Sequence, residues 1–69
     1  MLFTDVSSDR VVKALEKAGF KVKKQGKHIG MFNGLRHVII PRHKRINPYT
    51  LKAIIKDAGL TDEEFGNLL

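Results

Sequence analysis

Three histidines set among thirteen lysines and arginines are the residues of this 69-residue chain whose types suit acid–base chemistry. An imidazole, with an ordinary pKa of about 6.5, can accept or donate a proton near neutrality, and nearby cations can hold a charged phosphate. This combination suits metal-free RNA cleavage, in which the 2′-hydroxyl attacks the adjacent phosphate while a base and an acid move the protons. An exposed histidine on a basic surface is more often inert, so residue types alone favour this chemistry weakly.

Other chemistries lack their residues. Without cysteine there is neither a disulfide nor a thiolate metal site, which suits a cytosolic protein. His37 and His43 lie on either side of Pro41 without the helical spacing that joins metal ligands. The glycines lie in or beside expected strands, so they form no phosphate loop, and Ser7 and Ser8 precede a helix that they can cap. We therefore expect no metal and no cofactor.

The basic residues are concentrated in the middle of the chain. All thirteen lie between Arg10 and Lys56, where Glu16 is the one acid, so this span carries 13 − 1 = +12. The other six acids flank it: Asp5, Asp9, Asp57, Asp62, Glu63 and Glu64. A basic body with acidic ends is typical of a protein that binds a polyanion, although ordinary solvated lysines are the alternative.

A membrane partner is not expected. The sequence has no apolar run of about 18 residues, no basic signal-peptide start, and no helix that opposes a basic face to interfacial aromatic residues. We expect a complete, soluble, cytoplasmic protein.

The central stretch, residues 23–43, predicts a β-hairpin that is entered through a basic bend. Asn33-Gly34 is a strong signal for a two-residue type I′ turn, because both positions then need a positive φ. Such a turn fixes the register and places His37 opposite Gly30, where we expect it to pack across the strands.

The two faces of this hairpin differ in character. We expect the core face to carry Ile29, Met31, Val38 and Ile40. This choice leaves His28 pointing outward beside Lys27, although the opposite face is also largely apolar.

Cap and stop residues place the helices. The first is expected between Ser7 and Gly19, the second from Asn47 to Gly59, and a short last helix from Thr61. Alternation over residues 20–25 predicts an edge strand before the hairpin. The expected fold is one α+β domain over residues 1–69, with order α-β-β-β-α, a three-stranded antiparallel sheet, two helices on one of its faces, and a short C-terminal helix.

Four segments of the chain carry a resemblance to a known family. They are Ala14-Leu15-Glu16-Lys17-Ala18-Gly19-Phe20, Gln25-Gly26-Lys27-His28, Ile40-Pro41-Arg42-His43, and the stretch from Thr50-Leu51 through Asp57-Ala58-Gly59-Leu60-Thr61 to Glu64-Phe65. Together they resemble the HicA family of bacterial toxins. The resemblance implies a double-stranded-RNA-binding-like fold, an mRNA interferase activity, an mRNA substrate, and a HicB-type antitoxin that blocks the active site.

The resemblance also implies roles for particular residues. The family's catalytic histidine lies in a Gly-Ser-His motif that maps onto His28, and Lys27 replaces the serine here, where its charge could orient phosphate. The family's proline-x-histidine maps onto Pro41 and His43. We expect the RNA-binding surface to include Lys23, Lys24, Gly26, Lys27, Arg36, Arg42 and His43, with further phosphate contacts from Lys21 and Arg45.

Two functions remain open at this point. One is a ribonuclease toxin in which His28 is the general acid or base. The other is a non-catalytic module of the same fold that binds RNA through its lysines and arginines. A pure binder has no need of a titratable group at the bend, so His28 distinguishes the two.

Overall fold

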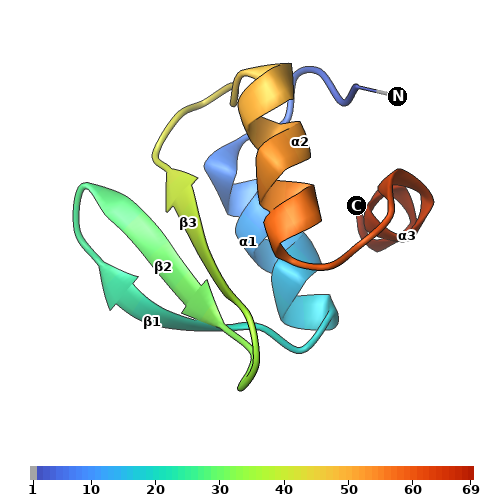
Figure 1. The fold of residues 1–69 in the computed structure, drawn as a ribbon. Coiled ribbons are helices and arrows are strands. Elements are labelled where there is room, and N and C mark those ends of the chain that lie inside the picture. The colour runs from blue at the N-terminus through green and yellow to red at the C-terminus, as the bar shows by residue number, and fades with distance from the viewer. Residues whose placement is uncertain (1) are drawn as a thin grey trace.

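The computed structural model describes residues 2–69 and has six elements of secondary structure. In chain order they are α1 (Ser8–Lys17), β1 (Lys21–Gln25), β2 (His28–Phe32), β3 (His37–Pro41), α2 (Pro48–Asp57) and α3 (Asp62–Leu68). Figure 1 shows that the helices lie on one side of the sheet, whose other face is left open. The predicted α+β arrangement is confirmed.

Capping interactions define the helix ends as predicted. The side-chain oxygens of Ser7, Asn47 and Thr61 each accept a backbone N–H from the first turn of α1, α2 and α3 respectively. Gly19 and Gly59 follow the first two helices with φ of 96° and 76°. This left-handed conformation lets the chain turn out of each helix, which directs it from α1 into β1 and from α2 into α3.

The predicted register of the hairpin is wrong by two residues. The sheet has the order β1-β2-β3 with antiparallel neighbours, but Gly30 pairs with Ile39, and Phe32 pairs with His37. Because side chains alternate between faces, a shift of two residues keeps each side chain on its predicted face. The predicted core face is therefore confirmed, whereas the predicted neighbours across the strands are not.

The cause of the shift is a loop of four residues, 33–36, in place of a two-residue turn. The Oδ1 of Asn33 accepts the N–H groups of Leu35 and Arg36 at 2.9 and 2.6 Å. The N–H of Asn33 also donates to the carbonyl of Arg36 at 3.2 Å. Gly34 has the predicted positive φ, 95°, but Asn33 does not, so the turn is not type I′. The asparagine side chain substitutes for backbone partners and widens the loop.

The core lies between the inner face of the sheet and the helices. Ile29, Met31, Val38 and Ile40 of the sheet are all buried there, and Phe65 anchors the short α3 against the same cluster. This packing fixes the sheet firmly while its outer face stays uncovered (Figure 1). No helix among residues 2–69 is long and apolar enough to cross a membrane.

Candidate functional site

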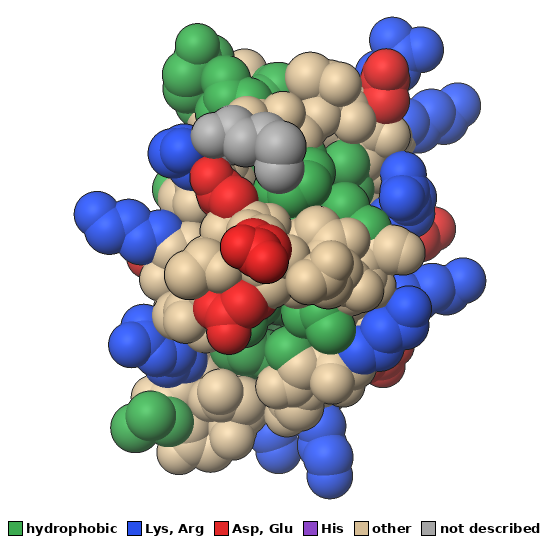
Figure 2. Space-filling model, turned by 90° about the vertical axis from the view of Figure 1, so that its right-hand side faces the viewer, with side chains coloured by type: hydrophobic (Ala, Val, Ile, Leu, Met, Phe, Trp, Pro, Cys, Tyr) green, Lys and Arg blue, Asp and Glu red, His purple; other side chains and the backbone are tan. Residues whose placement is uncertain are grey.

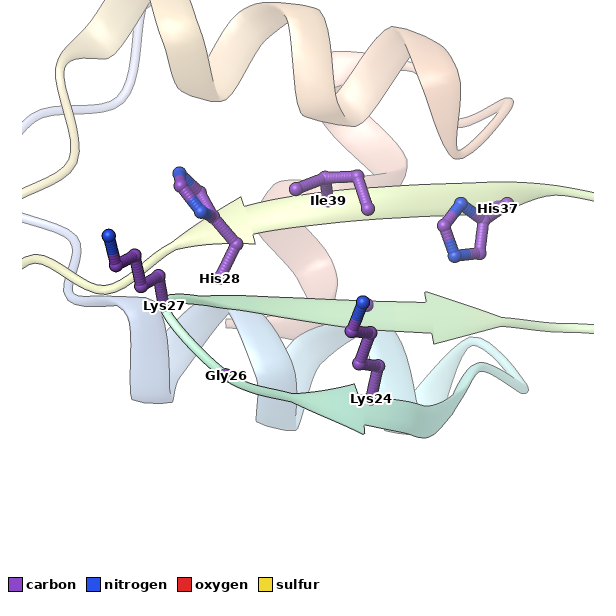
Figure 3. Close-up of a pocket in the computed structure, with 7 residues that line it drawn as sticks. Lys24, Gly26, Lys27, His28, His37 and Ile39 are labelled. Carbon is purple, nitrogen blue, oxygen red and sulfur yellow. The ribbon is translucent and has the colours of Figure 1, made fainter.

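A hollow of about 340 Å³ lies on the outer face of the sheet. Its lining comes from all three strands and from the bend between β1 and β2: Lys24, Gly26, Lys27, His28, Gly30, His37 and Ile39. Figure 3 shows the two imidazoles over this face, His28 near the bend and His37 farther along β3. None of these lining residues is acidic, so every ionisable side chain in the hollow is a lysine or a histidine.

The sheet creates the hollow by placing a glycine at its centre. Gly30 is in the middle strand, and it pairs with Lys24 on β1 and Ile39 on β3. Directly paired residues share a face, so the side chains of Lys24 and Ile39 flank a position that has none. A Cβ placed at Gly30 would lie 3.4 Å from Nε2 of His37 and 3.5 Å from Cβ of Lys24. Gly30 is itself buried, so the missing side chain lets the ring of His37 lie over the middle strand as part of the hollow's wall.

His28 is the first residue of β2, and its side chain is exposed. Hydrogen bonds hold the bend before it: the N–H of Gly26 donates to the carbonyl of His28 at 3.2 Å. Nε of Arg42, from the loop after β3, donates to the carbonyl of Gly26 at 2.7 Å. The bend is thereby tied to the far edge of the sheet, and it presents His28 and Lys27 together.

His37 reaches the hollow because its side chain lies on the outer face of the sheet, the face that alternation predicted. It stands opposite Phe32, and the two rings lie 6.4 Å apart, tilted by 51°. The predicted register instead placed His37 opposite Gly30 in a cross-strand packing role. The true pairing changes the backbone partners of His37, but its Nε2 still lies 3.4 Å from the position of a Cβ on Gly30.

The hollow brings together only part of the predicted RNA-binding set. Lys24, Gly26 and Lys27 line it with His28, and Arg42 is joined to it through the carbonyl of Gly26. The register of β1 shifts between Val22 and Lys24, and the intervening Lys23 lines a separate hollow with Lys21, Phe32, Asn33 and Gly34.

His43 and Arg36 lie elsewhere. His43 is exposed in the loop after β3, and its carbonyl accepts the N–H of Ser8 at 3.0 Å, which ties the loop to α1. Nη1 of Arg36 donates to the carbonyl of Asp57, at the end of α2, at 3.4 Å. The guanidinium lies so close to Gly59 that a Cβ there would come within 2.6 Å of its Nε. Arg36 thus joins the hairpin loop to the helices.

The acidic residues are separated from this site. Three of them form the first turn of α3: Asp62, Glu63 and Glu64. On the α3 side of the molecule, acidic side chains gather in the middle of the face while lysines and arginines project around it (Figure 2). Among residues 2–69, no three histidine, aspartate or glutamate side chains lie close enough together to hold a metal ion.

An α+β domain whose sheet carries a basic, histidine-bearing hollow on its open face agrees with the fold that the sequence resemblance implies. Residues 8–60 match the family described as the HicA toxin of bacterial toxin–antitoxin systems. This match covers well over half of the chain, which therefore belongs to the HicA toxin family. A search of curated proteins finds no match. The chain is a toxin of a toxin–antitoxin system, and its family indicates an antitoxin as a partner.

Proposed function

We infer that this toxin is an mRNA interferase, an endoribonuclease that uses His28 as a general acid or base and needs no metal. The observation that carries the proposal is the shared hollow on the open face of the sheet. It places the exposed side chain of His28 in the same lining as Lys24 and Lys27. Membership of the HicA toxin family supports the same activity.

The chemistry follows from the groups in the hollow. Neutral His28 takes the proton of a ribose 2′-hydroxyl, the 2′-oxygen forms a bond to the adjacent phosphorus, and the bond from phosphorus to the 5′-oxygen breaks. The leaving 5′-oxygen takes a proton from water. Lys24 and Lys27 hold the extra negative charge that gathers on the phosphate oxygens as the bond forms. The products are a 2′,3′-cyclic phosphate and a 5′-hydroxyl.

The antitoxin partner is proposed to be a HicB-type protein that covers this hollow. The open face of the sheet supports this proposal, because no part of residues 2–69 folds over it (Figure 1). A partner seated there would exclude mRNA from His28 and so neutralise the toxin.

The proposed reaction is tested by the ends of its products. Purified toxin is incubated in EDTA with a defined single-stranded RNA, and the fragments are examined by mass spectrometry. We expect fragments that end in a 2′,3′-cyclic phosphate and begin with a 5′-hydroxyl. A copy of the RNA with 2′-deoxyribose at the cut positions should stay intact.

Two outcomes would contradict the proposal. Fragments with a 5′-phosphate would show attack by water in place of the 2′-hydroxyl. RNA that binds to the toxin and is never cut would assign it to the non-catalytic RNA-binding alternative.

A further inference from the structure

The part of the hollow beyond His28 differs from a phosphate site. Around Gly30 the walls are Ile39, whose side chain is half exposed, and His37, which lies against Phe32. Apart from Lys24 this region offers a flat, partly apolar surface and an aromatic ring. Such surfaces suit a planar, weakly polar group better than they suit a phosphate.

The spacing along β2 relates this region to the site of cleavage. Gly30 is two residues beyond His28, a rise of about 6.6 Å at 3.3 Å per residue. An RNA that runs along β2 with its reacting phosphate at His28 has a neighbouring nucleotide at the level of Gly30. At that level the exposed ring of His37 lies over the buried Gly30, with Nε2 3.4 Å from the position of a Cβ, and this ring and Ile39 form the surface available to the neighbouring nucleotide.

We propose that this region, formed by Gly30, His37 and Ile39, binds one unpaired nucleobase next to the reacting phosphate. The inference rests on the proposed function and adds that the substrate is single-stranded at the cut. Single-stranded RNA is commonly bound by stacking of splayed bases on aromatic or histidine side chains. A base inside a duplex is stacked on both sides and cannot enter the hollow.

Gly30 offers the sharpest variant. Its φ is not in the left-handed region, and valine favours strands, so Gly30→Val is compatible with the backbone. Its added atoms displace the ring of His37, whose Nε2 lies 3.4 Å from the position of a Cβ, and crowd Lys24 at 3.5 Å. Gly30→Ala is the milder form of the same change, and Leu35→Ala, in the exposed loop outside the hollow, is the control.

The experiment measures binding, so that it does not depend on cleavage. Fluorescence anisotropy gives the dissociation constants for a 2′-O-methyl uridine oligomer, which cannot be cut, and for an abasic oligomer of equal length and charge. Base stacking predicts that removal of the bases weakens binding to wild type about ten- to hundredfold. For Gly30→Val, removal of the bases should weaken binding several-fold less than it does for wild type, and Gly30→Ala should lie between the two. Leu35→Ala should behave as wild type.

Other results decide against the subsite. The subsite is overturned if removal of the bases weakens binding equally for wild type and for a Gly30→Val variant that circular dichroism shows to be folded. If Gly30→Val fails to fold, Gly30→Ala answers the same question. The subsite is also overturned if Gly30→Val weakens the binding of a duplex as much as it weakens the binding of the single-stranded oligomer. A Gly30→Val variant that binds the oligomer normally and loses only antitoxin binding would overturn it too. If wild type shows the base dependence but never cuts RNA, the proposed function fails while the subsite stands.

Discussion

At the scale of single residues, the structure gives Arg42 a role that its sequence context did not predict. Within a basic cluster it looks like a phosphate contact, but its Nε is bound to the carbonyl of Gly26 at 2.7 Å. That bond holds the bend that presents His28 and Lys27. Arg42 is therefore a positioning residue for the hollow as well as a charge beside it.

A change that keeps the charge separates these two roles. Arg42→Lys removes Nε, so we expect kcat for RNA cleavage to fall roughly five- to tenfold, the effect of losing about 1–1.5 kcal/mol of hydrogen bonding. KM and the salt dependence of binding should change little. Arg10→Lys, exposed on α1, is the matched control. If Arg42→Lys cuts as fast as wild type, Arg42 acts through its charge alone.

At the scale of elements, the sequence predicted best where local chemistry decides the structure. Ser7, Asn47 and Thr61 cap helices, and Gly19 and Gly59 end them, because each interaction lies within a few residues. The same local reasoning found the correct faces of the hairpin, since side-chain alternation survives a shift of two residues.

The register of the hairpin depended on which of two turns residues 33–36 form. Asn33-Gly34 favours a two-residue turn, but the Oδ1 of Asn33 instead accepts two N–H groups and closes a loop of residues 33–36. The true backbone partners, Phe32 opposite His37 and Gly30 opposite Ile39, could not be predicted without this information. The packing of Arg36 on Gly59 was likewise beyond prediction, because it joins residues far apart in sequence.

Gly34 remains structurally required in the wider loop. Its φ of 95° is strained for any residue with a Cβ, and most of all for a β-branched one. Gly34→Val should lower the free energy of unfolding by about 1–3 kcal/mol, and the midpoint of thermal unfolding by about 4–8 °C per kcal/mol. Gly34→Asn, which tolerates this conformation, should cost less. Equal midpoints for wild type and Gly34→Val would show that the left-handed conformation is not needed.

At the scale of the whole molecule, the charges are sorted by face. The hollow on the outer face of the sheet has no acidic lining, whereas the face that carries α3 gathers acidic side chains in its middle (Figure 2). Such an arrangement orients a polyanion toward the sheet before any specific contact forms. The net charge of +6 understates this effect.

RNA binding should therefore weaken steeply with salt. Each phosphate contact with single-stranded RNA contributes a slope of about −0.7 in log K against log salt concentration. Lys24→Ala should make the slope less steep by about 0.7, because one contact is lost. Lys13→Ala, an exposed charge on α1, should leave it unchanged. An affinity that does not vary with salt would contradict phosphate binding by this surface.

The central claim is that His28 moves a proton during RNA cleavage, and single-turnover cleavage with saturating toxin in EDTA tests it most directly. His28→Ala should cut a defined RNA about 10²–10⁴ times more slowly than wild type, the usual loss of a general acid or base. Its thermal stability should be nearly unchanged, because the side chain is exposed. His37→Ala should bind RNA more weakly but cut at a similar rate once saturated. A His28→Ala toxin that cuts as fast as wild type would contradict the account.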